Sequence, residues 1–242
     1  MTQVVILNSG TGSRMGELTA DRPKCLVELT GGETILSRQL SLLTEFGLKD
    51  IVITTGPYEE MIKAHLKERF DKLRLSYVNN PHYRETNYIY SMYLLDDAIG
   101  EDVILMHGDM IFERVVLEKL VNIEYDDAVL VDPHVELPEK DFKALLEKGR
   151  IRQIGVDVFG QQAVSLQPVY KLSSVFFAAW MEEIRRFVED GNLKVYAENA
   201  LNNLLGELVL HPVELKEHFC MEVDDERDLE VARAYLTGKG AL

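Results

Sequence analysis

The feature that most constrains the fold is a glycine-rich loop that directly follows an apolar run near the N-terminus. Residues 4–7 are Val-Val-Ile-Leu, and residues 8–16 are Asn-Ser-Gly-Thr-Gly-Ser-Arg-Met-Gly. Because glycine lacks a Cβ, a strand that ends in such a loop can bring backbone N–H groups close to phosphate oxygens. Arg14 adds a fork of donors for phosphate, and Lys24 adds a compact positive charge. The stretch predicts a loop that binds the phosphates of a nucleotide. The residues expected to hold that nucleotide are Leu7, Asn8, Ser9, Gly10, Thr11, Gly12 and Ser13.

Two better-known phosphate loops fit this stretch poorly. The Walker pattern has four residues between its glycines and then Gly-Lys-Ser/Thr, which is absent here. The dinucleotide pattern Gly-x-Gly-x-x-Gly opens a long helix, whereas Gly16 comes one residue late and Pro23 breaks any helix. Taken alone, the loop is also explained by an ordinary glycine turn beside a solvated arginine and lysine.

Apolar runs of strand type alternate with segments of helical periodicity along the first half of the chain. The predicted strands cover residues 3–8, 50–54, 73–78, 102–107 and 127–132, and the predicted helices cover residues 34–46, 59–70, 89–98 and 113–121. Such alternation predicts a mostly parallel sheet with right-handed crossovers. Ligands of these sheets bind outside the carboxyl ends of the strands, which is where the glycine loop lies.

The second half of the chain has a less regular pattern. We predict a hairpin of residues 142–146 and 150–156, a loop over 157–168 and a strand over 169–177. The remaining predicted elements are helices 178–189 and 195–205, short strands 208–212 and 219–223, and a closing helix 225–236. Because no repeat, low-complexity segment or linker interrupts the pattern, residues 1–242 are predicted to form one domain.

Charge and cysteine content narrow the range of partners. The formal net charge of −15 disfavours binding to polynucleotide or to an anionic membrane. Cys25 and Cys220 lack the spacing of a disulfide framework or a zinc site, and no apolar run reaches membrane-spanning length. We expect a cytoplasmic protein that inserts into no membrane and meets an anionic nucleotide with a local basic site.

Two aspartates follow predicted strands. Asp109 comes after Gly108 at the end of strand 102–107, and Asp224 comes directly after strand 219–223. Two carboxylates from separate strands suit Mg²⁺, which takes one or two protein oxygens together with phosphates and water. Each aspartate by itself is also explained by a turn or a helix N-cap.

Several of these motifs together resemble the nucleotidylyltransferases that join a nucleoside triphosphate to a sugar phosphate or a phosphoalcohol. The resemblance rests on Gly-x-Gly-Ser-Arg-Met at residues 10–15, on Pro-Lys at 23–24 and on Leu-Val-Glu-Leu at 26–29. It implies a Rossmann-like three-layer α/β sandwich with a mixed, mostly parallel central sheet, and a Mg²⁺ ion held by Asp109 and Asp224. One departure is Asn8-Ser9, where the family usually has Ala-Ala or Ala-Gly.

Residues 80–91 distinguish between the subgroups of that family. Asn-Pro-x-Tyr at 80–83 and Thr-Asn-x-x-Tyr-Ser at 86–91 resemble the bacterial choline-phosphate cytidylyltransferases and their phosphonate-using relatives, although Tyr88 replaces an asparagine. Sugar-type members usually have a Gln- and Gly-rich segment here. The resemblance implies nucleotide contacts from Gly56, Asn80, Asn87 and Ser91, and acceptor contacts from Tyr90, Tyr196 and Glu198.

The implied reaction needs no general base, because a phosphate or phosphonate oxygen is already charged and can attack the α-phosphorus directly. Arg14, Lys24 and Asp109 are the predicted catalytic residues. We expect a Mg²⁺-dependent cytidylyltransferase that uses CTP and a small phosphorylated alcohol or a phosphonate, and that releases pyrophosphate. A sugar-1-phosphate nucleotidylyltransferase using UTP, CTP or dTTP and a nucleotide sensor without turnover are the alternatives. The oligomeric state is left open, a homodimer included.

Overall fold

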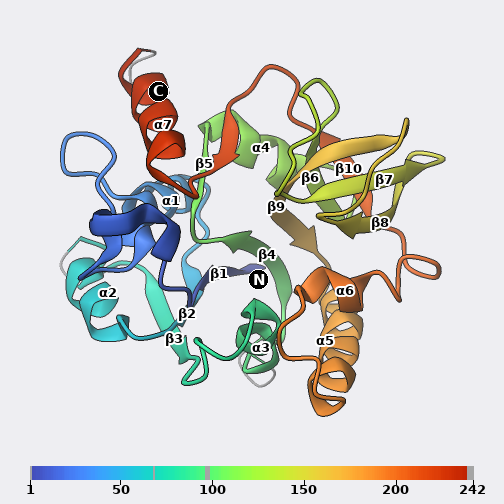
Figure 1. The fold of residues 1–242 in the computed structure, drawn as a ribbon, viewed down its shortest axis with the longest axis horizontal. Helices are drawn as coiled ribbons and strands as arrows, with labels where there is room; N and C mark the ends of the chain where they lie inside the picture. Colours follow the sequence, from blue (N-terminus) through green and yellow to red (C-terminus); the bar gives the residue numbers. More distant parts are fainter. Residues whose placement is uncertain (1, 68, 96–98, 239–242) are drawn as a thin grey trace.

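The computed structural model describes residues 2–67, 69–95 and 99–238, and within these residues its centre is a nine-stranded sheet (Figure 1). Seven strands follow the order β10-β6-β9-β4-β1-β2-β3, and the hairpin β7-β8 attaches to β9. All strands of this row run in one direction except β9, which is antiparallel to both of its neighbours. The mixed, mostly parallel sheet confirms the predicted fold class. Its strands are β1 (Thr2–Asn8), β2 (Asp50–Thr55), β3 (Arg74–Asn79), β4 (Asp102–His107), β6 (Ala128–Asp132), β7 (Lys143–Glu147), β8 (Arg150–Gly155), β9 (Ala163–Leu172) and β10 (His211–Glu214).

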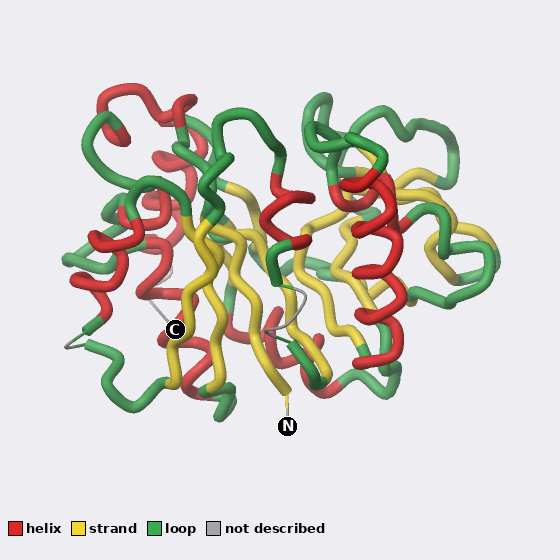
Figure 2. The backbone as a smooth tube through the Cα atoms, turned by 90° about the horizontal axis from the view of Figure 1, so that it is seen from below, coloured by secondary structure: helices red, strands yellow, loops and turns green. Residues whose placement is uncertain are grey.

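Helices cover both faces of the sheet, and Figure 2 shows the strands running side by side between them. The helices are α1 (Ile35–Glu45), α2 (Glu59–Leu66), α3 (Tyr88–Tyr93), α4 (Arg114–Asn122), α5 (Ser174–Glu189), α6 (Ala197–Leu201) and α7 (Glu226–Gly238). Val4 and Ile6 of β1 pack in the cluster that contains the apolar residues of α1, α2 and α4, whereas Val5 packs in the cluster with α3, α5 and α6. This alternation follows from the two-residue period of a strand. Among the described residues, none of the helices combines the length and apolar content that crossing a membrane requires.

A second, two-stranded sheet joins distant parts of the chain. It pairs β5 (Met110–Phe112) with β11 (Cys220–Glu222) in antiparallel fashion, so that Met110 lies opposite Glu222. The pairing places the turn after β4 beside the segment that follows β11. This small sheet therefore sets where Asp109 and Asp224 lie.

The sequence prediction is wrong over residues 163–168 and 173–177, whereas the loop over 157–162 and the strand over 169–172 are confirmed. The predicted loop at 157–168 contains the first half of β9, and the predicted strand at 169–177 ends at Leu172, because α5 begins at Ser174. The hydroxyl of Ser173 accepts a hydrogen bond from the Phe176 N–H at 3.2 Å, which caps the helix. The first half of β9 was therefore not predicted. The strand is hydrogen-bonded to both β4 and β6.

Smaller differences concern element boundaries. The strand predicted at 208–212 lies at His211–Glu214, the helix predicted at 195–205 is reduced to Ala197–Leu201, and β5 was not predicted. The predicted helices 59–70 and 89–98 include residues 68 and 96–98, which lie outside the described residues; the described helices end at Leu66 and Tyr93.

Candidate active site

A cavity of about 290 Å³ opens at the carboxyl ends of β1, β3 and β4. The predicted site residues that line it are Leu7, Asn8, Ser9, Gly10, Gly12, Ser13, Arg14, Lys24, Asn80, Asn87, Ser91, Asp109 and Asp224. The predicted residues that are not part of its lining are Thr11, Gly56, Tyr90, Tyr196 and Glu198. The cavity therefore gathers most of the predicted nucleotide and metal residues, whereas the predicted acceptor residues are not part of its lining.

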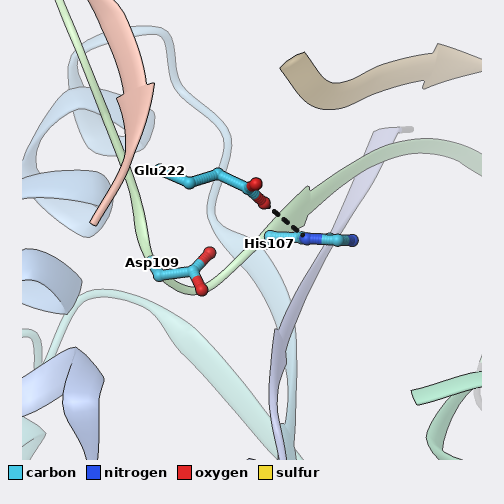
Figure 3. A group of neighbouring side chains, drawn as sticks. All are labelled: His107, Asp109 and Glu222. Carbon is cyan, nitrogen blue, oxygen red and sulfur yellow. Dashed lines mark hydrogen bonds and ion pairs between the residues drawn. The ribbon is translucent and has the colours of Figure 1, made fainter. Parts of the chain in front are cut away.

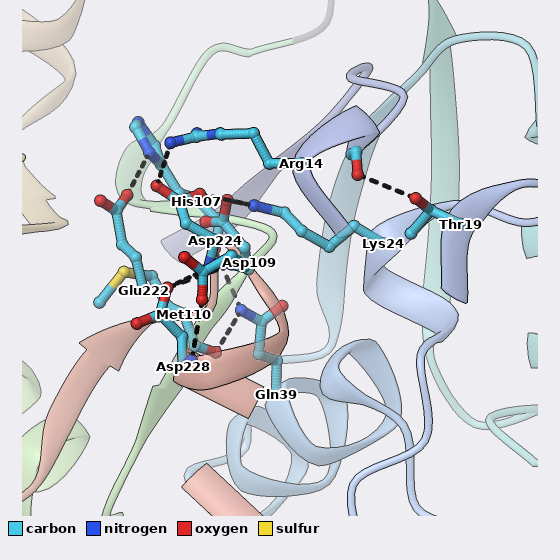
Figure 4. Close-up of polar contacts among 12 residues, drawn as sticks. Arg14, Thr19, Lys24, Gln39, His107, Asp109, Met110, Glu222, Asp224 and Asp228 are labelled. Atoms are coloured by element: carbon cyan, nitrogen blue, oxygen red, sulfur yellow. Dashed lines mark hydrogen bonds and ion pairs between the residues drawn. The ribbon is translucent and has the colours of Figure 1, made fainter. Parts of the chain in front are cut away.

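The two aspartates predicted from distant strands converge. The N–H of Val223 donates to the carbonyl oxygen of Asp109 at 3.0 Å, which ties the segment after β11 to the turn after β4. The ammonium of Lys24 contacts both carboxylates, Asp224 at 2.9 Å and Asp109 through a short ion pair (Figure 4). Arg14 contacts the other oxygen of Asp224 at 2.7 Å, and its side chain remains 64% exposed. The predicted cations and carboxylates thus form one cluster.

The charges of this cluster are mutually stabilised. Burial by itself lowers the pKa of Lys24, but the carboxylates of Asp109 and Asp224 raise it to about 12. Burial would raise the pKa of Asp109, but the neighbouring charges of Lys24 and His107 outweigh burial and hold that pKa below its usual value. Lys24 is therefore cationic and Asp109 anionic at neutral pH.

The donor set fits a hard divalent cation. Asp109 Oδ1 is buried and has no hydrogen-bond partner among the described residues, so one carboxylate oxygen is available to a ligand. Side-chain ligand atoms of Asp141, Glu222 and Asp224 lie within 4.8 Å of one another, as do those of His107, Asp109 and Glu222. Carboxylate oxygens are the ligands that Mg²⁺ prefers in proteins. Asp109 and Asp224 are the residues that would hold it.

His107 and Glu222 lie beside this cluster and were not among the predicted site residues. His107 Nδ1 contacts Glu222 Oε1 at 3.0 Å (Figure 3). Burial lowers the pKa of His107, but the bond to Glu222 and the surrounding carboxylates raise it to about 8; burial raises the pKa of Glu222. Their spacing in the sequence could have identified them, since each comes two residues before a predicted metal-binding aspartate.

The glycine loop is shaped by backbone conformations that only glycine adopts easily. Gly12 has a φ of 68°, and a Cβ built on it would lie 2.7 Å from Lys24 Cβ. The Gly12 carbonyl accepts hydrogen bonds from the Met15 N–H at 2.9 Å and from the Thr19 hydroxyl at 2.8 Å. These bonds start the short 3₁₀ helix Ser13–Thr19 and leave the space around Gly10 open. The absence of a Cβ thus lets the loop pack directly on the lysine.

The segment after β3 forms the opposite wall around a buried asparagine. Asn80 Nδ2 donates to Ser91 Oγ at 3.0 Å and to Thr86 Oγ1 at 3.2 Å, and Asn80 Oδ1 accepts from the His82 N–H at 2.8 Å. Asn87 caps α3 by accepting from the Tyr88 N–H. The Asn-Pro motif therefore shapes this wall through bonds within the segment.

Two of the predicted acceptor residues, Tyr196 and Glu198, lie next to Tyr88, whereas the ring of Tyr90 contacts those of His82 and Tyr93. Glu198 is buried and its carboxylate accepts hydrogen bonds from the hydroxyls of Tyr170, at 2.9 Å, and Tyr88. Tyr88 lines the cavity in place of Tyr90, and its ring lies 6.0 Å from the ring of Tyr196. Gly56 packs directly against the backbone of Ser9, since a Cβ built on Gly56 would be 2.3 Å from the Ser9 carbonyl oxygen. Binding roles for these residues stay predictions.

The chain is similar in sequence to two proteins named for cytidylyl or CMP chemistry and similar in fold to one solved structure. CMP-5'-(3-aminopropyl)phosphonate synthase of Streptomyces rubellomurinus is 34% identical over 118 residues, which are 49% of this chain and 19% of that longer protein. CTP:phosphoglutamine cytidylyltransferase of Campylobacter jejuni is 25% identical over 252 residues, covering 94% of this chain and 97% of the relative. The inositol-1-phosphate CTP transferase of T. maritima has the same fold, with a TM-score of 0.80 at 19% identity over 100% of this chain and 98% of that one.

One family model spans most of the chain. The model of the MobA-like NTP transferase domain matches residues 4–203, from β1 through α6. The match includes the glycine loop, Lys24 and Asp109, and the sequence resemblance to nucleotidylyltransferases is thereby confirmed. The chain belongs to the family of MobA-like NTP transferase domains.

Proposed function

We propose that the protein is a Mg²⁺-dependent cytidylyltransferase. It transfers CMP from CTP to a small phosphorylated alcohol such as phosphocholine, or to a phosphonate, and releases pyrophosphate. The observation that carries the proposal is the convergence of Lys24, Asp109 and Asp224 on one wall of a cavity that the glycine loop borders. Two relatives named for cytidylyl chemistry support CTP as the nucleotide.

The proposed roles follow from charge and position. Bound Mg²⁺ supplies charge neutralisation for the phosphates, and Asp109 and Asp224 hold it. Lys24 neutralises the charge on the group that is transferred, because its ammonium already lies between the two carboxylates. Arg14 is exposed enough to turn from Asp224 towards the leaving pyrophosphate. The acceptor oxygen is anionic and attacks the α-phosphorus, so no side chain has to remove a proton.

The acceptor side favours a molecule that also carries a positive charge. The Tyr88 ring lines the cavity and lies 6.0 Å from the ring of Tyr196, which lies 5.0 Å from the ring of Phe142. The carboxylates of Asp141 and Glu222 lie at the same end. Aromatic faces and carboxylates together attract ammonium groups. This environment supports an amine-bearing phosphate ester or phosphonate as acceptor.

Pyrophosphate release tests the proposal directly. The purified protein is incubated with Mg²⁺ and each of CTP, UTP, dTTP and ATP, in combination with phosphocholine, 2-aminoethylphosphonate or glucose-1-phosphate. We expect pyrophosphate only with CTP and an amine-bearing acceptor, and no pyrophosphate when EDTA removes the metal.

Two results would replace the proposal by an alternative. Turnover confined to glucose-1-phosphate with UTP or dTTP would identify a sugar-1-phosphate nucleotidylyltransferase. Tight CTP binding without pyrophosphate from any acceptor would identify a nucleotide sensor.

A further inference from the structure

Two polar side-chain atoms in the cavity wall are buried without a partner. Asn8 Nδ2 and Ser9 Oγ have no hydrogen-bond partner among the described residues, and both residues line the cavity. Ser9 is 7% exposed as a whole. A buried donor without an acceptor is unfavourable, so such groups are normally satisfied by something that binds beside them.

The Asn8 side chain is held in one place. Asn8 ends β1, where its N–H donates to the Thr54 hydroxyl at 3.1 Å. Its amide lies against the α-carbon of Gly108, because a Cβ built on Gly108 would be 1.8 Å from Asn8 Oδ1. A side chain at position 108 would occupy the space of that amide. Asn8 and Gly108 are therefore complementary in size, and the amide is fixed beside Asp109.

The place of this amide suggests which part of the nucleotide it meets. On the proposed function, the triphosphate lies along residues 10–14 and the metal lies at Asp109 and Asp224. Asn8 precedes that loop and touches the turn before Asp109. The ribose joins the base to the phosphates. It is therefore the part of the nucleotide that passes between the loop of residues 10–14 and the turn at Gly108.

We propose that the Asn8 amide donates a hydrogen bond to a ribose hydroxyl of CTP and makes the enzyme select ribonucleotides over deoxyribonucleotides. The inference rests on the proposed function. A fixed donor loses its partner when that hydroxyl is absent, and a site built for a hydroxyl rejects the analogue that lacks it.

Calorimetric titration tests this without knowledge of the acceptor. The full chain is titrated with CTP, 2′-deoxy-CTP and 3′-deoxy-CTP in the presence of Mg²⁺. We expect the wild type to bind CTP about tenfold more tightly than one of the two deoxy analogues. In Asn8→Ala, CTP binding should weaken about tenfold, whereas binding of that analogue changes less than twofold.

A matched control separates this role from a general loss of packing. Asn202 makes two hydrogen bonds of 2.8 Å to the backbone of Ile154, away from the cavity. Asn202→Ala should lower the melting temperature and leave the preference for ribose unchanged. Asn8→Ala should melt near the wild-type temperature without ligand, because the lost Nδ2 group has no hydrogen-bond partner among the described residues.

The outcomes distinguish this inference from the function on which it rests. If Asn8→Ala keeps the wild-type ratio of CTP to both deoxy analogues, the inference is wrong and the proposed function stands. Failure of the wild type to bind CTP at all overturns both.

Discussion

At the scale of single residues, the proposed function gives Lys24 the central role, because its ammonium contacts both aspartates of the cluster. It contacts Asp109 and Asp224 at once, and its pKa of about 12 keeps it charged throughout the physiological range. A fixed cation in a partly buried site stabilises developing phosphate charge more than a solvated one, because solvent screens it less.

Replacing Lys24 tests this directly. Lys24→Gln should lower kcat about 100-fold to 1000-fold, because the charge on the transferred group is no longer neutralised. Steady-state pyrophosphate release measures the effect. Lys67→Gln alters an exposed lysine at the end of α2 and serves as the control. Its kcat should equal that of the wild type. A kcat for Lys24→Gln within threefold of the control would remove Lys24 from the mechanism.

His107 should make the stability of the metal-free protein depend on pH. Its pKa is raised to about 8 in the folded state, against about 6.5 in an unfolded chain. The protonated form therefore stabilises the fold fully below pH ~6.5, and that stabilisation is lost as the pH rises through about 8. The loss amounts to about 2 kcal/mol at most.

Urea unfolding of EDTA-treated protein between pH 6 and pH 9 measures this dependence. The free energy of unfolding should fall across that range in the wild type and be nearly flat in His107→Gln. His134→Gln changes an exposed histidine and should keep the wild-type slope. Equal slopes in all three proteins would contradict the assignment.

At the scale of elements, the segment before β7 owes its shape to a buried lysine. Lys143 is fully buried, and its ammonium donates to the carbonyl oxygens of Pro138 at 2.6 Å and Asp141 at 3.0 Å. Burial lowers the pKa of Lys143. The lysine thereby fixes the segment that carries Asp141, which lies near Glu222 and Asp224, and Phe142, which lies beside Tyr196.

Removing that ammonium should loosen the segment. Lys143→Met removes the donor shared by the partly buried carbonyl groups of Pro138, Glu139 and Asp141 and should lower the free energy of unfolding by about 2 kcal/mol. It should raise KM for the acceptor more than KM for CTP, since Asp141 and Phe142 shift. Chemical denaturation and steady-state kinetics measure the two effects. Lys140→Met, at an exposed position of the same segment, is the matched control. Equal stability of the two variants would show that the carbonyl contacts contribute nothing.

At the scale of the whole molecule, the small β5–β11 sheet links distant segments of the chain. Asp109 follows β4 and Asp224 follows β11, and the β5–β11 pair holds the two together. A ligand that binds only the folded arrangement stabilises it in proportion to its occupancy, by about 2.7 kcal/mol at 100 times Kd. Mg²⁺ with CTP should therefore raise the melting temperature of the entire domain.

Asp109→Ala should abolish both this shift and turnover while the protein stays folded. Thermal unfolding with and without Mg²⁺ and CTP measures the shift, and circular dichroism checks the fold. Asp71→Ala removes an exposed carboxylate and should keep the wild-type shift. An unchanged shift in Asp109→Ala would exclude this carboxylate from ligand binding.

The sequence alone determined the features that arise from local chemistry. The βαβ alternation, the glycine loop and the two strand-end aspartates were all predicted, because side-chain periodicity and glycine geometry act within a few residues. Tertiary structure decided which of these groups meet. Only the register of β11 against β5 sets Asp224 beside Asp109. Only the hydrogen bonds from Tyr88 and Tyr170 hold the Glu198 carboxylate outside the cavity lining. Only the pairing with β4 and β6 makes residues 163–172 a central strand. These contacts join residues far apart in the chain, and no local pattern encodes them.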